Sequence, residues 1–370
     1  VQNSVKISNW LIAIFTTMFA IRTGGEYWNH GPFYRLPIGS AFWYFFYIGE
    51  TRLIQKILGE KTRLITEETR EKIIGKAIEN KFELVAVVTA PDKPSGRGKK
   101  ITFSAVKKLA EKNKLKILQP NNLSQHLFID EIKSLKPDLI VVVAFRMLPK
   151  VVWTIPPMGT INLHASLLPN YRGAAPINWV IINQEKTTGV TTFFIDEKID
   201  SGKILLQQKL KINSNVDAGS LYEKLAEVGS ELVCDTINGI IDKTIRPKVQ
   251  KLNGKEKRAP KLDKQNTFIN WSQSPEAINA KIKGLSPYPG AKTNFTENNQ
   301  SIVIKIFETE ILKKSHNFKL NKVLIKNREI LIAVKDGFLK CKILQFPNRK
   351  RMSALDILNG HTFSSKIEVN

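Results

Sequence analysis

Apolar positions between residues 71 and 241 follow two alternating periods, which predicts a layered α/β domain. Short runs rich in Val and Ile indicate strands buried on both faces, over residues 83–88, 139–144, 159–163, 188–195 and 204–212. Helical spacing predicts a short helix over 71–80, a second that Ser104 caps and that runs through Glu111, and a long one over 219–241. We expect a mostly parallel open sheet that binds ligands outside the carboxyl ends of its strands.

The last third of the chain has a different pattern. Short strand-like runs occupy residues 302–307, 322–325, 330–334 and 338–346. Their regular spacing predicts a small β-barrel. The stretch before it, residues 243–266, is rich in lysine and shows neither period, which predicts a linker.

The first 62 residues do not match the rest of the chain. Thirteen of the 32 aromatic residues lie within the first fifty positions. Their two apolar runs, 10–21 and 38–48, are shorter than the roughly 20 residues of a spanning helix, so we expect no stable membrane insertion. We expect this segment to have no part in catalysis, and we interpret it as foreign sequence that has been joined to the start of the chain. A weak membrane-surface element is the alternative.

The charge of the chain indicates the kind of partner that it binds. The 370-residue chain carries a formal net charge of +24, and residues 243–370 hold 26 Lys plus Arg against 10 Asp plus Glu. A solvated lysine-rich face is one interpretation. The concentration of charge favours the other, a domain that binds a polyanion such as nucleic acid.

Cysteine usage excludes two classes of small scaffold. Only Cys234 and Cys341 occur, far apart and without a neighbouring His or Cys at metal spacing. Neither a disulfide framework nor a zinc site is indicated, and we expect a protein of the reducing cytoplasm.

The candidate chemistry lies at the end of the run over 159–163. Asn162 and His164 are two residues apart on an extended segment, so their side chains point to the same side. Asp200, from a later loop, can then set the charge of the histidine. An amide and an imidazole that converge on one atom indicate an enzyme.

Four ordered motifs carry a resemblance to a known family. They are Asn162-Leu-His-Ala-Ser-Leu-Leu-Pro-Asn-Tyr-Arg-Gly-Ala-Ala-Pro176, residues 196–202, residues 91–100 and Leu285-Ser-Pro-Tyr-Pro-Gly290. From about residue 71 to its end the chain resembles the methionyl-tRNA formyltransferases. The resemblance implies a Rossmann-like formyltransferase domain with a mostly parallel sheet, followed by an OB-like β-barrel. It divides the chain into the N-terminal segment (1–62), a catalytic domain (63–242), a basic linker (243–266) and a tRNA-binding barrel (267–370).

The implied reaction moves a formyl group from 10-formyltetrahydrofolate to the amino group of methionyl initiator tRNA, without a metal. Charge builds on the former carbonyl oxygen during such a transfer, so hydrogen-bond donors must be aimed at it. We expect Asn162 and His164 to stabilise that oxygen. Asp200 is expected to favour the imidazolium and to assist proton transfer.

The resemblance also implies contacts to the folate. Ser166, Leu167, Leu168 and Pro169 are similar to the family's tetrahydrofolate-binding segment. The pterin would lie between Phe145, Arg146, Met147 and Leu148 on one side and the loop of Ile195 and Asp196 on the other. Plain core packing is the alternative for Leu167 and Leu168.

The loop over 92–100 is the expected contact to the acceptor stem. It carries Lys93, Arg97, Lys99 and Lys100, of which Arg97 is the best single candidate. A mobile basic surface loop is the alternative. Phosphate binding by this loop and the barrel predicts a strong dependence on salt.

One departure from the family pattern is large. The family opens with a strand that ends in Gly-Thr-Pro-x-Phe-Ala, and residues 63–70 of this chain read Arg-Leu-Ile-Thr-Glu-Glu-Thr-Arg. An upstream reading-frame error explains the abrupt mismatch better than gradual divergence. Three hypotheses remain: an active enzyme, presumed monomeric; an inactive tRNA-binding protein with a damaged first strand; and a formyltransferase that acts on a nucleotide or sugar amine.

Overall fold

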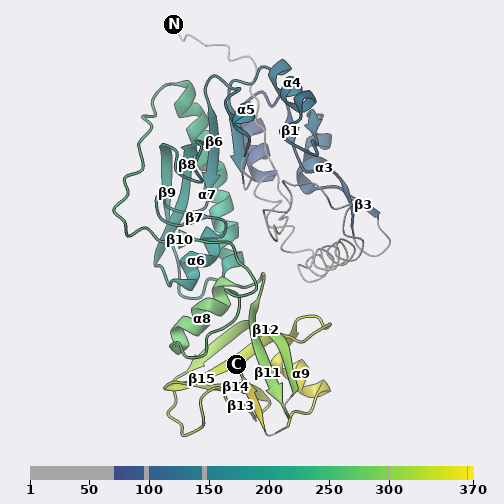
Figure 1. Cartoon of the computed structure of the whole chain (residues 1–370), viewed down its shortest axis with the longest axis vertical. Coiled ribbons are helices and arrows are strands. Elements are labelled where there is room, and N and C mark those ends of the chain that lie inside the picture. Colours follow the sequence, from purple (N-terminus) through teal and green to yellow (C-terminus); the bar gives the residue numbers. More distant parts are fainter. Residues whose placement is uncertain (1–70, 96–99, 144–147, 299, 365) are drawn as a thin grey trace, which may run out of the picture. The chain divides into compact units, whose positions relative to one another are not determined.

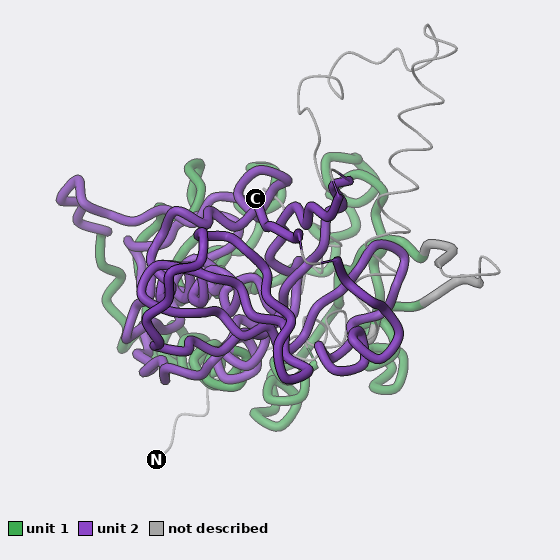
Figure 2. Tube along the Cα trace, turned by 90° about the horizontal axis from the view of Figure 1, so that it is seen from below, with its two compact units in different colours: residues 1–164, 192–206, 226–249 green, residues 165–191, 207–225, 250–370 purple. Residues whose placement is uncertain are grey.

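The computed structural model describes residues 71–95, 100–143, 148–298, 300–364 and 366–370 (Figure 1). Their contacts divide into two compact units, which Figure 2 colours separately. The first unit holds the described residues up to 164 together with 192–206 and 226–249. The second holds 165–191, 207–225 and 250–370. The expected strand over 63–66 and the segment 1–62 lie outside the described residues.

Parallel strands form the centre of the first unit. The strands are β1 (Val87–Val88), β4 (Ile117–Leu118), β5 (Ile140–Val143) and β6 (Thr160–His164), and β8 (Thr187–Phe194) and β9 (Ile204–Lys211) continue from one unit into the other. β1 pairs with β4 in parallel, and β5 pairs with β6 in parallel. The second of these sheets has the order β5-β6-β8-β9. The expected mostly parallel α/β sheet is confirmed.

Two apolar clusters cover the two faces of these strands. Val87 of β1 and Val141 of β5 belong to one cluster, and Val88 and Val142 belong to the other. Successive residues of a strand point to opposite faces, so both strands are buried on both sides. This double burial explains why each strand is an unbroken apolar run in the sequence.

The described part of the first unit holds the three helices that the sequence predicts and two short ones, over 126–134 and 150–153, that it does not. They are the helix over 71–79, α3 (Ala105–Lys112), α4 (His126–Ser134), the short α5 (Lys150–Trp153) and α7 (Ala218–Ile241), which extends into the second unit. The Ser104 hydroxyl accepts a hydrogen bond from the Lys107 amide at 3.1 Å, which confirms the predicted cap. A Cβ on Gly229 of α7 would lie 2.8 Å from Leu163, so the glycine lets this helix approach β6 closely.

Antiparallel strands dominate the second unit. They are β11 (Ala291–Glu297), β12 (Gln300–Leu312), β13 (Val323–Lys326), β14 (Glu329–Val334), β15 (Gly337–Gln345), β16 (Met352–Ser353) and β17 (Ile367–Val369). Their order is β13-β14-β15-β12-β11-β17, with β16 on β15. A bridge between Lys322 and Glu368 brings the two ends of this order together, so the sheet is a nearly closed barrel. The predicted C-terminal barrel is confirmed.

The barrel encloses a core of its own. Ile306, Ile332 and Leu339 are almost completely buried in its cluster. Two capped helices, α8 (Pro275–Gly284) and α9 (Ala354–Gly360), contribute buried residues to the same cluster. In Figure 1, α8 lies against the barrel strands.

The predicted linker contains a strand. β10 (Arg258–Ala259) pairs in parallel with β7 (Arg172–Gly173), just before α6 (Pro176–Ile182). A Cβ on Gly173, whose φ is +126°, would lie 2.4 Å from the Ala259 carbonyl oxygen, so the pairing requires glycine. Only two residues pair, which explains why the lysine-rich sequence shows no strand period.

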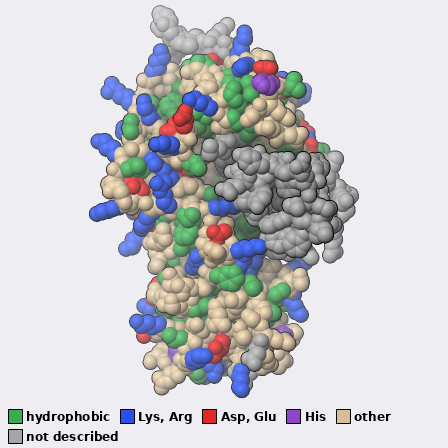
Figure 3. Space-filling view, in the orientation of Figure 1, with side chains coloured by type: hydrophobic (Ala, Val, Ile, Leu, Met, Phe, Trp, Pro, Cys, Tyr) green, Lys and Arg blue, Asp and Glu red, His purple; other side chains and the backbone are tan. Residues whose placement is uncertain are grey.

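Surface and cysteine properties complete the description. Lysine and arginine side chains are spread over the face seen in Figure 3, with fewer acidic ones between them. Both cysteines are free and buried. Within the described ranges, no helix is long and apolar enough to cross a membrane, and no cluster of three or more His, Cys, Asp or Glu could hold a metal ion.

Candidate active site

β6 presents Asn162 and His164 on one side. The residues on either side of Asn162, Ile161 and Leu163, pack into the cluster that also holds Val141, so they point to the opposite side. His164 is the last residue of the strand and is only 7% exposed. The alternation predicted from the sequence therefore places the amide and the imidazole together at the carboxyl end of a parallel strand.

Asp200 lies beside His164, as the sequence predicted. The histidine Nδ1 is 3.7 Å from the Asp200 Oδ2, and the two side chains are 7% and 13% exposed. This distance exceeds an ordinary hydrogen bond but is short for two charges that water screens little. The carboxylate is thus placed to stabilise positive charge on the imidazole.

The loop that carries Asp200 has a constrained backbone. Asp200 has a φ of +52°, a left-handed conformation that Asp and Asn tolerate better than most residues. A Cβ on Gly202 would lie 1.7 Å from the Phe194 carbonyl oxygen, so this position must be glycine. Asp196 fixes the start of the loop, because its Oδ1 accepts hydrogen bonds from the Lys198 amide and the Ser201 hydroxyl. Asp196 therefore has a structural task within the loop.

Asn162 has a buried polar atom with no partner. Its Oδ1 makes no hydrogen bond with the described part of the chain. Buried polar groups are nearly always satisfied, and one left open at a strand end is suited to a ligand.

Comparisons with known proteins agree with this geometry. Residues 64–237 match the family described as "Formyl transferase", and residues 261–362 match "Formyl transferase, C-terminal domain". A methionyl-tRNA formyltransferase from Flavobacterium johnsoniae is 48% identical over 313 residues, which cover 84% of this chain and 99% of that protein. One from Bacteroides thetaiotaomicron is 40% identical over 79% of this chain and 92% of its own. This chain belongs to the methionyl-tRNA formyltransferase family.

Solved structures show the same fold at lower identity. An N-formyltransferase from Helicobacter canadensis, solved with folinic acid and dTDP-3-aminofucose, has a TM-score of 0.55 and 23% identity, covering 74% of this chain and 95% of its own. The sugar 3N-formyl transferase WlaRD has a TM-score of 0.54 and 22% identity, covering 76% and 95%. At these identities the likeness concerns the fold alone.

In this member of the methionyl-tRNA formyltransferase family, hydrogen bonds to backbone atoms hold the segment over 166–169 in place. Ser166 is fully buried, and its hydroxyl donates to the Asn170 carbonyl at 2.7 Å. Leu168 is 3% exposed and is followed by the cis proline Pro169. Leu167 lies beside Gly189. The burial of Leu168 agrees with the packing alternative for this residue.

Thr191 supports that segment, and sequence reasoning missed it. Its hydroxyl donates to the Ser166 carbonyl at 2.6 Å and accepts from the Leu168 amide at 3.2 Å and from Gln207 Nε2 at 2.9 Å. One hydroxyl thereby uses its donor and both acceptor positions. The sequence gives no signal for this role, because Thr191 is one of four threonines in β8 and nothing local distinguishes it from the others.

A second support pins the residues after Pro169. The Tyr171 hydroxyl and the Lys257 ammonium both donate to the Glu185 Oε1 at 2.6 Å. Burial acts to raise the pKa of Glu185, but these two hydrogen bonds outweigh it and lower the pKa. The Lys257 side chain, from the predicted linker, is therefore part of the framework behind the segment.

The remaining predicted residues are only partly described. Phe145, Arg146 and Met147 lie outside the described residues, as do Arg97 and Lys99. Leu148 is 7% exposed, and Ile195 packs against the same cluster. Lys93 begins β2 (Lys93–Ser95) and Lys100 begins β3 (Lys100–Thr102), which pair as an antiparallel hairpin.

Proposed function

We propose that this chain transfers the formyl group of 10-formyltetrahydrofolate to the amino group of methionyl initiator tRNA. The observation that carries the proposal is the placement of Asn162, His164 and Asp200 at one strand end, within a chain of the methionyl-tRNA formyltransferase family. The 48% identity to a relative of that name spans nearly the whole relative. This breadth favours a tRNA acceptor over the sugar nucleotides of the solved structures.

Each residue of the site has a part in the transfer. The amine nitrogen attacks the formyl carbon, and the bond from that carbon to N10 of the folate breaks. Asn162 and His164 donate hydrogen bonds to the formyl oxygen while it is negatively charged. Asp200 stabilises the protonated imidazole and assists movement of the proton from the amine to N10.

The residues present fit the folate co-substrate, which supplies the formyl group. The Asn162 Oδ1 is a buried acceptor that no described residue uses. Ser166, Leu167, Leu168 and Pro169 contribute through the backbone of their segment, which Thr191 holds. Leu148 and Ile195 offer apolar surface for the pterin, with Phe145, Arg146 and Met147 completing the enclosure.

The RNA contacts are assigned to basic groups. Arg97, with Lys93, Lys99 and Lys100, approaches the acceptor stem, and the basic barrel contacts phosphates. Affinity for tRNA should fall at least about tenfold between about 50 and 200 mM salt, because each phosphate contact releases counterions. Affinity for the folate should change little over the same range.

The decisive experiment is formylation by the purified protein. The parent should transfer formyl groups to methionyl initiator tRNA, and not to a sugar nucleotide amine. Asp200→Asn keeps the left-handed backbone and removes the charge, so turnover should fall about tenfold or more across pH 6 to 9. An inactive parent that still binds tRNA would favour the alternative of an inactive tRNA-binding protein. Unchanged turnover in Asp200→Asn would refute the role of Asp200.

A further inference from the structure

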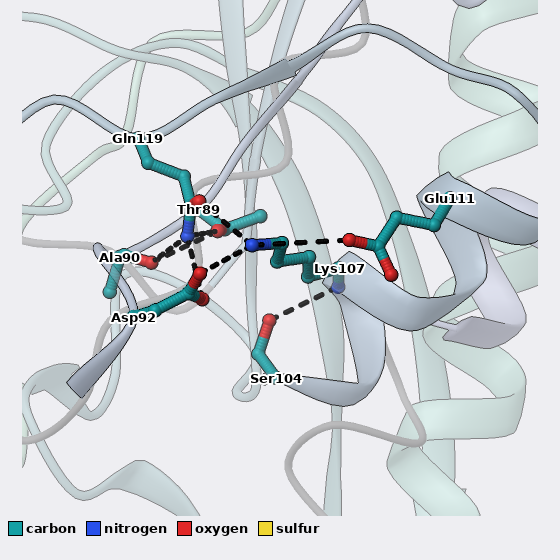
Figure 4. Close-up of polar contacts among 7 residues, drawn as sticks. All are labelled: Thr89, Ala90, Asp92, Ser104, Lys107, Glu111 and Gln119. Atoms are coloured by element: carbon teal, nitrogen blue, oxygen red, sulfur yellow. Dashed lines mark hydrogen bonds and ion pairs between the residues drawn. The ribbon is translucent and has the colours of Figure 1, made fainter. Parts of the chain in front are cut away.

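A polar network joins the carboxyl ends of β1 and β4 in the first unit (Figure 4). The Gln119 side chain, directly after β4, donates through Nε2 to the Ala90 carbonyl at 2.8 Å and to the Asp92 Oδ1 at 3.1 Å. It also reaches the Thr89 hydroxyl at 3.3 Å. One amide thus fixes the chain between β1 and β2.

Lys107 of α3 completes the network from the other side. Its ammonium donates to the second oxygen of Asp92 and to the Gln119 Oε1, the latter at 3.2 Å. It also lies 3.9 Å from a Glu111 oxygen and 4.3 Å from the centre of the Phe103 ring. A single cation therefore contacts four different residues.

These contacts join the two ends of the basic hairpin. Asp92 directly precedes β2, and Phe103 directly follows β3. Lys93 and Thr102, the first and last residues of the hairpin, are also paired in its ladder. Lys107 touches the chain on both sides, so residues 93–102 leave the sheet and return to it at fixed points.

The network is sheltered from solvent. The side chains of Lys107 and Asp92 are 13% and 23% exposed, so water screens their attraction less than at an open surface. Burial acts to raise the pKa of Asp92, but its hydrogen bonds to Lys107 and Gln119 outweigh it and lower the pKa. The carboxylate is thereby kept charged at neutral pH.

We infer that Lys107, Asp92 and Gln119 form a clamp that positions the basic hairpin for the RNA acceptor. The inference rests on the proposed function, in which this hairpin approaches the acceptor stem. An ion pair that only stabilised α3 would have no need of the contacts to the residues that flank the hairpin. Lys107 is on this account a positioning residue, which acts through the hairpin and touches no substrate.

The test compares two neighbouring lysines of α3. Lys107→Met removes the clamp cation and keeps most of its length, whereas Lys108→Met removes the same charge from an exposed position of the helix. Lys107→Met should raise the KM for methionyl-tRNA about tenfold and leave kcat and the KM for the folate within twofold. Lys108→Met should leave kcat and both KM values within twofold of the parent. Lys107→Arg keeps the cation, so its KM for methionyl-tRNA should be close to the parent's.

Limited trypsin digestion reports the clamp without RNA. Cleavage after Arg97, Lys99 or Lys100 should be several-fold faster in Lys107→Met than in Lys108→Met. Asp92→Asn, a milder change, should act in the same direction and add little to Lys107→Met in the double variant, because both break one network. These effects should appear while the unfolding midpoints of the variants remain close to the parent's.

Separate outcomes overturn the clamp and the proposed function. A parent protein that fails to formylate methionyl-tRNA refutes the proposed function before any variant is made. With an active parent, the clamp is refuted if Lys107→Met keeps the parent's KM for methionyl-tRNA. It is equally refuted if kcat and both KM values fall or rise together, or if the hairpin is cleaved at the parent's rate.

Discussion

The parallel strands around β6 and the antiparallel barrel use their buried residues for different purposes. At the end of β6, His164 is buried beside a carboxylate, and the amide of Asn162 has a buried oxygen that no described residue satisfies. The barrel packs an apolar core around Leu339, and its strands also bury polar groups, among them the Gln345 Oε1, which no described residue satisfies. The unsatisfied polar group at the end of β6 lowers the stability of the fold and is available to a ligand, whereas the apolar core of the barrel stabilises the fold.

This contrast separates two kinds of function. A transfer reaction needs a few donors held within fractions of an ångström, so it is suited to the end of a rigid strand and to a constrained loop beside it. Binding of a polyanion needs many charges and tolerates their motion, so it can come from the outside of a barrel. Substitutions should therefore lower turnover in the first region and lower stability or RNA affinity in the second.

The largest effect is expected from a substitution in the barrel core that lowers the free energy of unfolding. Leu339 is fully buried on β15, opposite Ile311 and Ile332. Leu339→Ala should lower the free energy of unfolding by about 2–5 kcal/mol, because it leaves a cavity in a packed core. Urea unfolding measures this loss. Leu320→Ala, at a side chain that is 50% exposed, is the control and should cost well under 1 kcal/mol.

Asn162→Ala tests the other side of the contrast. Loss of one donor to the formyl oxygen should lower kcat by about 10²–10³. The unfolding midpoint should stay the same or rise, because the substitution removes a buried polar atom that has no protein partner. Formylation kinetics and thermal unfolding measure the two effects. If stability and activity fell together, Asn162 would be a structural residue and the contrast would fail.

The sequence predicted those features that depend on local pattern. The apolar runs located β5, β6 and the four barrel strands β12 to β15, and Ser104 was correctly identified as the cap of α3. The motif of Asn162 and His164 predicted their shared face, since alternation along a strand fixes which side chains point to one side, and Asp200 was correctly expected beside His164.

Features that depend on distant partners escaped prediction. The pairing of β10 with β7 involves two residues in a lysine-rich stretch, and no period reveals it. Thr191 and Lys107 are ordinary residues of a strand and a helix until their partners from other segments are known. β12 is also longer than its apolar run, because it continues past an irregularity at Glu308 through polar residues that still pair with β15.

The smallest expected effect concerns Lys305 of β12, a partly buried lysine of the barrel. Lys305 donates to the Pro289 carbonyl at 2.9 Å, and burial, with the charges of Lys292 and Arg351, lowers its pKa to about 8. The unfolded chain then binds the proton more readily, so raising the pH from about 8 to the ordinary lysine value of 10.5 favours the folded state.

Lys305→Met removes this dependence. From pH 7.5 to 10, the parent should gain about 1–2 kcal/mol relative to the variant, a value discounted because the side chain is part-exposed. Burial raises the pKa of Cys234 and Cys341, which opposes the trend, but both thiols are present in both proteins and cancel in the difference. Lys326→Met removes the same charge from an exposed position and should give a flat difference. If the difference in unfolding free energy between the parent and Lys305→Met also did not change with pH, the Lys305 ammonium would be as well solvated as that of an ordinary surface lysine. The barrel would then hold no buried charge at this position.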